Sequence, residues 1–283
     1  MGFFNYTAED VTNAVQASIA GFDSTVQGIT GLMSFNLDGS DWEKIANVVK
    51  QVSTGISGVA ICMAVIYTYL AITREGLTLK GDFKRILSIV LRLCITKGLI
   101  DSATSFMFWI YSFGAKITQI VCDKTTGGNS SLATIFKAED ITIGLGVAQA
   151  NNPSGFDYFI ALQYAKILGF FMWGLSIVLV IIGLARIIKI YLMSMFSSIA
   201  FAKLPLEGYN GIKEYISSYL GLSLQGAVIV GAIAIYKICL ANIGIISAFY
   251  TDNVFGSFGV IVVLSISLIL IIAQSENIAK KFV

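Results

Sequence analysis

Long apolar runs, separated by shorter polar segments, dominate the chain. Four runs are typical of membrane spans: residues 52–72, 167–185, 219–240 and 258–273. About 20 mostly apolar residues are needed to cross about 30 Å of hydrocarbon as a helix. A fifth run, residues 86–113, is long enough but carries three charges, Arg92, Lys97 and Asp101. The pattern predicts an all-α polytopic membrane protein with about five transmembrane helices.

The run at 167–185 does not end as a membrane helix should. Arg186 and Lys189 interrupt it, and a second apolar segment, residues 190–202, follows at once. That segment has only 13 residues, which is too short for an untilted crossing. We therefore expect Arg186 and Lys189 to form a cytoplasmic collar, and 190–202 to be a half-segment that re-enters the membrane or lies at its surface.

The N-terminal segment has a different pattern. Between residues 7 and 35, apolar positions recur every three or four residues, which predicts an amphipathic helix rather than a span. Asn13 and Asp23 lie off this stripe. A helix on a lipid surface would carry Lys or Arg on its polar face, and this one has neither. We expect the stripe to pack within the assembly, against another subunit or this chain's own spans. Its members are Val11, Val15, Ser18, Phe22, Val26, Ile29 and Met33.

Charge distribution predicts the orientation in the membrane. The loop at 73–85 contains four basic residues, and the tail carries Lys280 and Lys281, so both should be cytoplasmic. Five spans then place the N-terminus outside and the C-terminus inside. The predicted parts are an external N-terminal segment (1–51), two spans (52–113), an external central loop (114–157) and three spans with the half-segment and the basic tail (158–283).

Polar residues inside the predicted spans are candidate functional residues, because charges in a membrane are costly and usually face a partner or a water-filled cavity. Lys97 and Asp101 are four residues apart and share one helix face, so they can neutralise each other; alternatively, Arg92, Lys97 and Asp101 line a polar conduit. Later in the chain, small residues at four-residue spacing predict close helix packing. The amide side chain of Gln225 among them is expected to form a hydrogen bond with another helix. These residues are Ser223, Gln225, Ala227 and Gly231.

Composition argues against catalysis. Only 13% of residues are charged, 56% are hydrophobic, and the chain has no histidine. Its four cysteines are scattered without metal-binding spacing, and there is no G-x-x-x-x-G-K-S/T motif for a nucleotide. We expect no catalytic residues, no metal and no cofactor. A membrane protease or acyltransferase is disfavoured, because neither a paired intramembrane Asp nor a G-x-S-x-G motif is present.

Three passages resemble a known family. They are KIYLMSMFSSIAFAKL (189–204), IKEYISSYLGLSLQGAVIV (212–230) and SENIAKKF (275–282). Across about the last 120 residues the chain resembles the TrbL-type family, the polytopic inner-membrane subunits of conjugative type IV secretion systems, especially those of Gram-positive elements. The first half is similar only in layout.

The resemblance implies a non-catalytic channel or scaffold subunit in the bacterial cytoplasmic membrane. It implies a homo-oligomeric ring that assembles with other secretion subunits, including membrane-associated ATPases. It also implies transient contact of the central loop with translocating single-stranded DNA and its relaxase. The alternative is a small-solute transporter or ion channel acting alone, which Arg92, Lys97 and Asp101 could equally serve.

Overall fold

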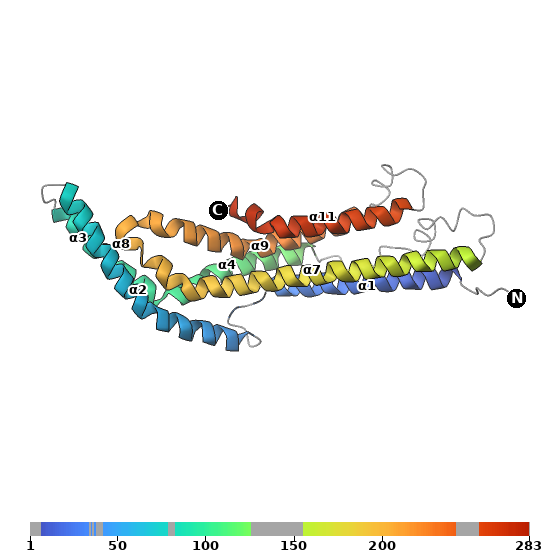
Figure 1. Cartoon of the computed structure of the whole chain (residues 1–283), viewed down its shortest axis with the longest axis horizontal. Helices are drawn as coiled ribbons and strands as arrows, with labels where there is room; N and C mark the ends of the chain where they lie inside the picture. Colours follow the sequence, from blue (N-terminus) through green and yellow to red (C-terminus); the bar gives the residue numbers. More distant parts are fainter. Residues whose placement is uncertain are drawn as a thin grey trace. The chain divides into compact units, whose positions relative to one another are not determined.

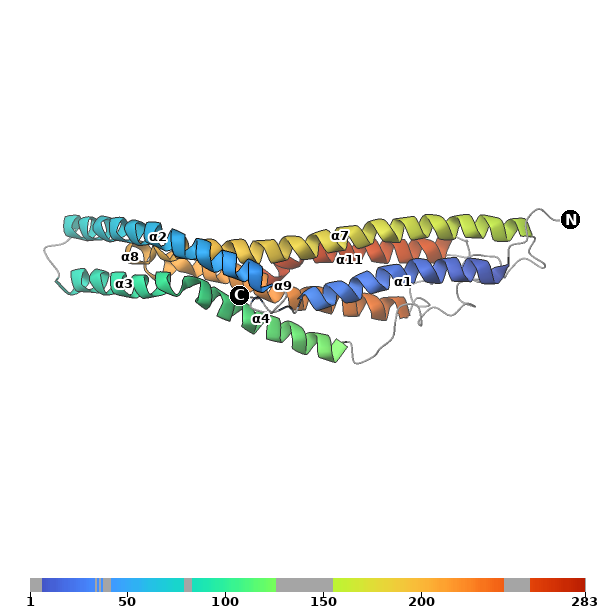
Figure 2. The same ribbon diagram turned by 90° about the horizontal axis from the view of Figure 1, so that it is seen from below.

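The computed structural model describes residues 7–33, 35, 37, 42–78, 83–125, 155–241 and 255–282. The regular elements in these ranges are all helices (Figures 1 and 2). In chain order they are α1 (Ala8–Met33), α2 (Glu43–Thr78), α3 (Phe83–Asp101), α4 (Ala103–Thr125), α7 (Gly155–Phe201), α8 (Leu204–Glu207), α9 (Tyr209–Ala241) and α11 (Phe255–Lys280).

Four of the described helices are long and apolar enough to cross a membrane, which confirms the all-α membrane class. These candidate spans are Glu43–Arg74, Tyr158–Phe201, Tyr209–Cys239 and Val262–Lys280, and each overlaps one of the four predicted spans. The fifth predicted span, 86–113, is not among them. The structure divides it at Ser102 into α3 and α4, although the Ser102 amide still donates to the Gly98 carbonyl at 3.2 Å.

Helix α7 is longer than the sequence pattern predicts. It runs without a break through Arg186 and Lys189 and ends at Phe201, so residues 190–202 are not a separate element. Its 47 residues correspond to about 70 Å of helix, more than twice the thickness of the hydrocarbon. The chain then turns through α8, which has a proline in its first turn, and Gly208, whose φ of 62° favours glycine, before α9 begins.

The chain folds into two compact units, each built from three separate stretches. The first unit comprises Met1–Met33, Gln119–Leu184 and Ala227–Ser275. The second comprises Ser34–Thr118, Ala185–Gly226 and Glu276–Val283.

The core of the first unit joins α1 to α7, α9 and α11. Phe22, Val26, Ile29 and Met33 of the predicted stripe are buried in one cluster with residues of those three helices. The amphipathic N-terminal helix is therefore confirmed, and its apolar partners are this chain's own helices. Burial of such side chains contributes roughly 1.5 to 3 kcal/mol each.

The buried arc of α1 is wider than the predicted stripe, because it includes Asp23. This carboxylate is 2% exposed; Oδ1 lies 3.6 Å from Lys237 Nζ of α9, and Gln27 donates to Oδ2 at 3.1 Å. Phe22, beside it in sequence, contacts the Tyr236 ring edge-on. An ion pair therefore joins α1 to α9 inside the first unit.

In the second unit, α2 and α3 form a helical hairpin, and the short helix α8 packs against it. Helices α2 and α3 run side by side, and α8 contacts both of them (Figure 2). Thr104 of α4 donates to Ser53 of α2 at 2.6 Å, and the Tyr111 hydroxyl donates to the Phe35 carbonyl at 3.2 Å. This unit holds the polar residues described next.

Candidate functional site

The three predicted charges of the second span lie on α3, and the structure does not bring them together. Arg92, Lys97 and Asp101 are all exposed, and no ion pair joins Lys97 to Asp101 within the described ranges. The Arg92 guanidinium instead lies beside Gly208, where an added Cβ would be 3.4 Å from Nη1. Whether these residues line a conduit stays a prediction.

Arg186 is the most deeply buried charge among the described residues of the second unit. Only 2% of it is exposed; Nε donates to the Leu222 carbonyl at 3.3 Å and Nη2 to the Ser223 carbonyl at 3.2 Å. Its guanidinium also lies 5.9 Å from the centre of the Tyr111 ring. Carbonyl dipoles and an aromatic face both stabilise a desolvated cation. Arg186 therefore connects α7 to α9 and α4, and whether it marks the cytoplasmic side stays a prediction.

Two tyrosines extend this polar contact along α7 and α9. Tyr219 shares a hydrogen bond of 2.8 Å with Ser194, and the Tyr215 hydroxyl donates to the Met193 carbonyl. With Arg186 and Tyr111 they form a set that we call the α7–α9 polar contact. Apolar periodicity does not distinguish these tyrosines from their neighbours, although a buried tyrosine usually forms a hydrogen bond through its hydroxyl.

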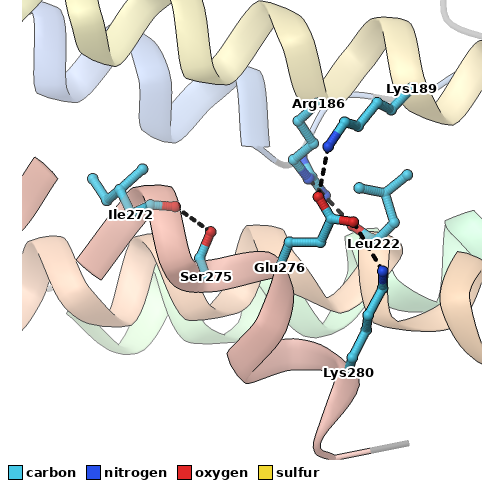
Figure 3. Close-up of polar contacts among 7 residues, drawn as sticks. All are labelled: Arg186, Lys189, Leu222, Ile272, Ser275, Glu276 and Lys280. Carbon is cyan, nitrogen blue, oxygen red and sulfur yellow. Dashed lines mark hydrogen bonds and ion pairs between the residues drawn. The ribbon is translucent and has the colours of Figure 1, made fainter. Parts of the chain in front are cut away.

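Lys189, one turn after Arg186, has a different partner. Its Nζ lies 2.6 Å from Glu276 Oε2 of α11, and Lys280 Nζ lies 3.0 Å from Glu276 Oε1 (Figure 3). Figure 3 shows the Glu276 carboxylate between the two lysines, close to Arg186 and Leu222. Ala279 is fully buried, so the end of α11 packs against the protein. Glu276 was also missed, although it is the only acidic residue after Asp252.

We expect Glu276→Gln to weaken this contact only modestly. The Lys189 side chain is 56% exposed and the Glu276 side chain 26%, and solvent-exposed ion pairs contribute about 0.2 to 1 kcal/mol. Loss of unfolding free energy should therefore stay below about 1 kcal/mol, and should shrink further in high salt. Thermal unfolding in detergent at two salt concentrations measures the loss of stability and its dependence on salt. A large loss that salt does not change would show that Glu276 acts by packing instead.

The four predicted packing residues of α9 lie in different surroundings. Ser223 is buried against Gly114 of α4, where an added Cβ would be 2.6 Å from Ser223 Oγ and 2.8 Å from its backbone carbonyl carbon. Gln225 is buried and Ala227 half-buried, whereas a Cβ on Gly231 would meet nothing within 4 Å. Of these four residues, Ser223 therefore lies at the closest helix approach, and its partner glycine lies on α4.

The described residues contain no group of three His, Cys, Asp or Glu side chains that could hold a metal ion. The buried polar groups are arginine, tyrosine, serine and backbone carbonyls, which join helices by hydrogen bonds. This chemistry holds a bundle together across helices that are distant in sequence. No family model matches the sequence, and neither a curated protein nor a solved structure matches it.

Proposed function

We propose that this membrane protein is a non-catalytic channel or scaffold subunit of a conjugative type IV secretion apparatus. It resides in the bacterial cytoplasmic membrane with its N-terminus outside and its C-terminus inside. Together with further copies and other subunits of the apparatus, including membrane-associated ATPases, it helps single-stranded DNA and its relaxase to cross. The central loop, which is the proposed contact with this cargo, lies mostly outside the described residues.

One observation carries the proposal: most of each of the three passages that resemble the family lies in the second unit, where they contact one another. Lys189 of the first passage pairs with Glu276 of the third. Ser194 of the first shares a hydrogen bond with Tyr219 of the second. Gly221 of the second approaches Lys280 of the third, where an added Cβ would be 2.9 Å from its side chain. Passages up to 87 residues apart therefore form one packed site, which supports a common structural role for them.

The surface charges of the same passages support the proposed orientation. Lys189, Lys203, Lys213, Lys280 and Lys281 are all exposed in the second unit. Basic residues beside spans favour the cytoplasmic side. Exposed lysines there suit contact with cytoplasmic partners and with anionic lipid headgroups, although Glu214 beside Lys213 is exposed as well.

Transfer of the genetic element that encodes the protein tests the proposal. In-frame deletion of the gene should lower the transfer frequency by orders of magnitude, and the wild-type gene supplied separately should restore it. The Gly231→Ala variant, whose new methyl group meets open space, is the matched control and should restore transfer equally. Normal transfer after deletion would refute the proposal, and solute flux by the purified protein alone in liposomes would favour a transporter or ion channel.

A further inference from the structure

Helix α1 has an exposed face that carries no large apolar side chain. Among the described side chains of α1, the large apolar ones are all buried or half-buried against the first unit. The exposed residues in the second half of the helix are small or polar and carry no charge. We call them the α1 outer face, and they are Ala20, Gly21, Ser24, Gln27, Gly28 and Gly31.

The other helices of the first unit expose the opposite kind of surface. Large apolar side chains on α7, α9 and α11 are between 56% and 74% exposed, namely Phe170, Ile181, Ile235 and Leu270. Surfaces of this kind suit contact with lipid tails, which are as apolar as leucine. Within this unit, the surface that suits lipid therefore lies on α7, α9 and α11, and the α1 outer face differs from it.

Packing against α7 places the α1 outer face at the depth of the hydrocarbon. An added Cβ at Gly169 would be 2.5 Å from Ser18 Oγ, and one at Gly183 would be 3.3 Å from Met33 Cε. The two helices therefore run parallel, side by side, over about 22 Å (Figure 1). This part of α7 belongs to the uncharged run 167–185, which lies in a candidate span. Helix α1 is not itself a candidate span, so a helix less apolar than a span lies beside one.

A partly exposed ammonium group lies at the edge of this face. Lys237 of α9 pairs with Asp23 of α1 at 3.6 Å, and the lysine side chain is 24% exposed. Gln27 of the α1 outer face donates to the same carboxylate at 3.1 Å, so the ion pair adjoins the face. Asp23 follows Ser18 by five residues, which places it about level with Gly174, near the middle of the uncharged run of α7. Charges at this depth usually face a partner or a water-filled cavity.

Water can satisfy this ammonium group, whereas lipid tails and apolar side chains cannot. An ammonium carries three N–H donors, and the contact of Lys237 with Asp23 is longer than a good hydrogen bond. Donors that are taken out of water without acceptors cost several kcal/mol. The exposed Gln27 amide, at nearly the same depth, has the same requirement. Both groups favour water beside α1.

We propose that the α1 outer face lines a water-filled passage at the depth of the hydrocarbon. Gly21, Gly28 and Gly31 leave room along it, because an added Cβ at each would meet nothing within 4 Å. The uncharged face would not hold a polyanion tightly, since that requires several Lys or Arg. The inference extends the proposed channel role without depending on it, because a solute transporter could have the same water-lined face. The transfer assay and the labelling assay below can therefore fail separately.

Labelling of single cysteines with a charged methanethiosulfonate reagent tests the proposal. The reagent stays in water, and the reactive thiolate forms only where water reaches the thiol. In open membrane fragments that contain the full chain without its native cysteines, Ser24→Cys and Gly28→Cys should react about tenfold or more faster than Ile177→Cys and Ile181→Cys. These controls lie at a similar depth on α7, where the isoleucines are 40% and 59% exposed.

The four labelled positions are exposed, so these changes spare the core, and thermal unfolding in detergent checks that each variant is folded. Gly21→Cys, on the same face, replaces either α1 variant that folds poorly. Slow labelling at all four positions would overturn the proposal, because lipid or another protein then covers the α1 outer face. Equally fast labelling at all four would also overturn it, because this part of α7 would then lie outside the hydrocarbon.

Discussion

Replacing Gly114 with alanine is expected to lower the free energy of unfolding by about 1 to 3 kcal/mol, the cost of overpacking a close contact. An added Cβ at Gly114 would lie 2.6 Å from Ser223 Oγ and 2.7 Å from Ser223 Cβ. It would also lie 2.8 Å from the Ser223 backbone carbonyl carbon, so α4 and α9 must move apart. Thermal or denaturant unfolding in detergent, followed by circular dichroism, measures the loss.

Gly231→Ala is the matched control for Gly114→Ala. Both glycines lie inside helices, but an added Cβ at Gly231 meets nothing within 4 Å. This variant should gain roughly 0.5 to 1 kcal/mol from helix propensity, the opposite sign to Gly114→Ala. Ser223→Gly should relieve part of the Gly114→Ala loss, because it removes two of the three close atoms. Equal stability of Gly114→Ala and wild type would show that the two helices do not approach this closely.

Arg186→Ala should be the most damaging single change in the α7–α9 polar contact. It removes the hydrogen bonds to the Leu222 and Ser223 carbonyls and the contact with the Tyr111 ring, and it leaves a cavity in a fully packed site. Truncation of a large buried side chain costs about 3 to 5 kcal/mol, and hydrogen bonds made by a charged group add to the loss. Unfolding in detergent should show a loss of this size, together with a lower yield of folded protein.

Arg186→Met separates volume from charge. Methionine fills most of the cavity but makes no hydrogen bonds, and it spares the desolvation cost of the guanidinium. The Met variant should therefore lose clearly less stability than the Ala variant. Arg186→Lys keeps the charge but lacks the planar fork that reaches two carbonyls at once. An Arg186→Ala variant as stable as wild type would mean that the guanidinium does not hold α7 against α9.

The sequence predicted the apolar helices better than the polar contacts. The spans and the α1 stripe follow from local periodicity, which the printed residues show directly. The end of α7 could not be predicted in the same way. Arg186 and Lys189 look like the end of a membrane helix, but the carbonyls of α9 bind the arginine and Glu276 of α11 binds the lysine. Those partners lie 36 and 87 residues further along the chain.

Asp23 illustrates the same limit in the first unit. Beside Phe22 it interrupts the apolar stripe, so periodicity places it on a solvated face. In the structure it is buried because Lys237 of α9 pairs with it. Similarly, nothing in α3 alone shows that Lys97 and Asp101 are exposed and unpaired with each other. Helical spacing permits that pair but cannot show whether it forms.

The docking of α11 on α7 has a consequence for biogenesis. Lys189 is translated 87 residues before its partner Glu276. During translation, the surface around Gly221 and Lys189 therefore stays uncovered until residues 276–282 have left the ribosome, and contacts between distant residues form late. Insertion factors that shield nascent spans would have to hold this surface throughout that interval, and release from them would coincide with the arrival of the last helix.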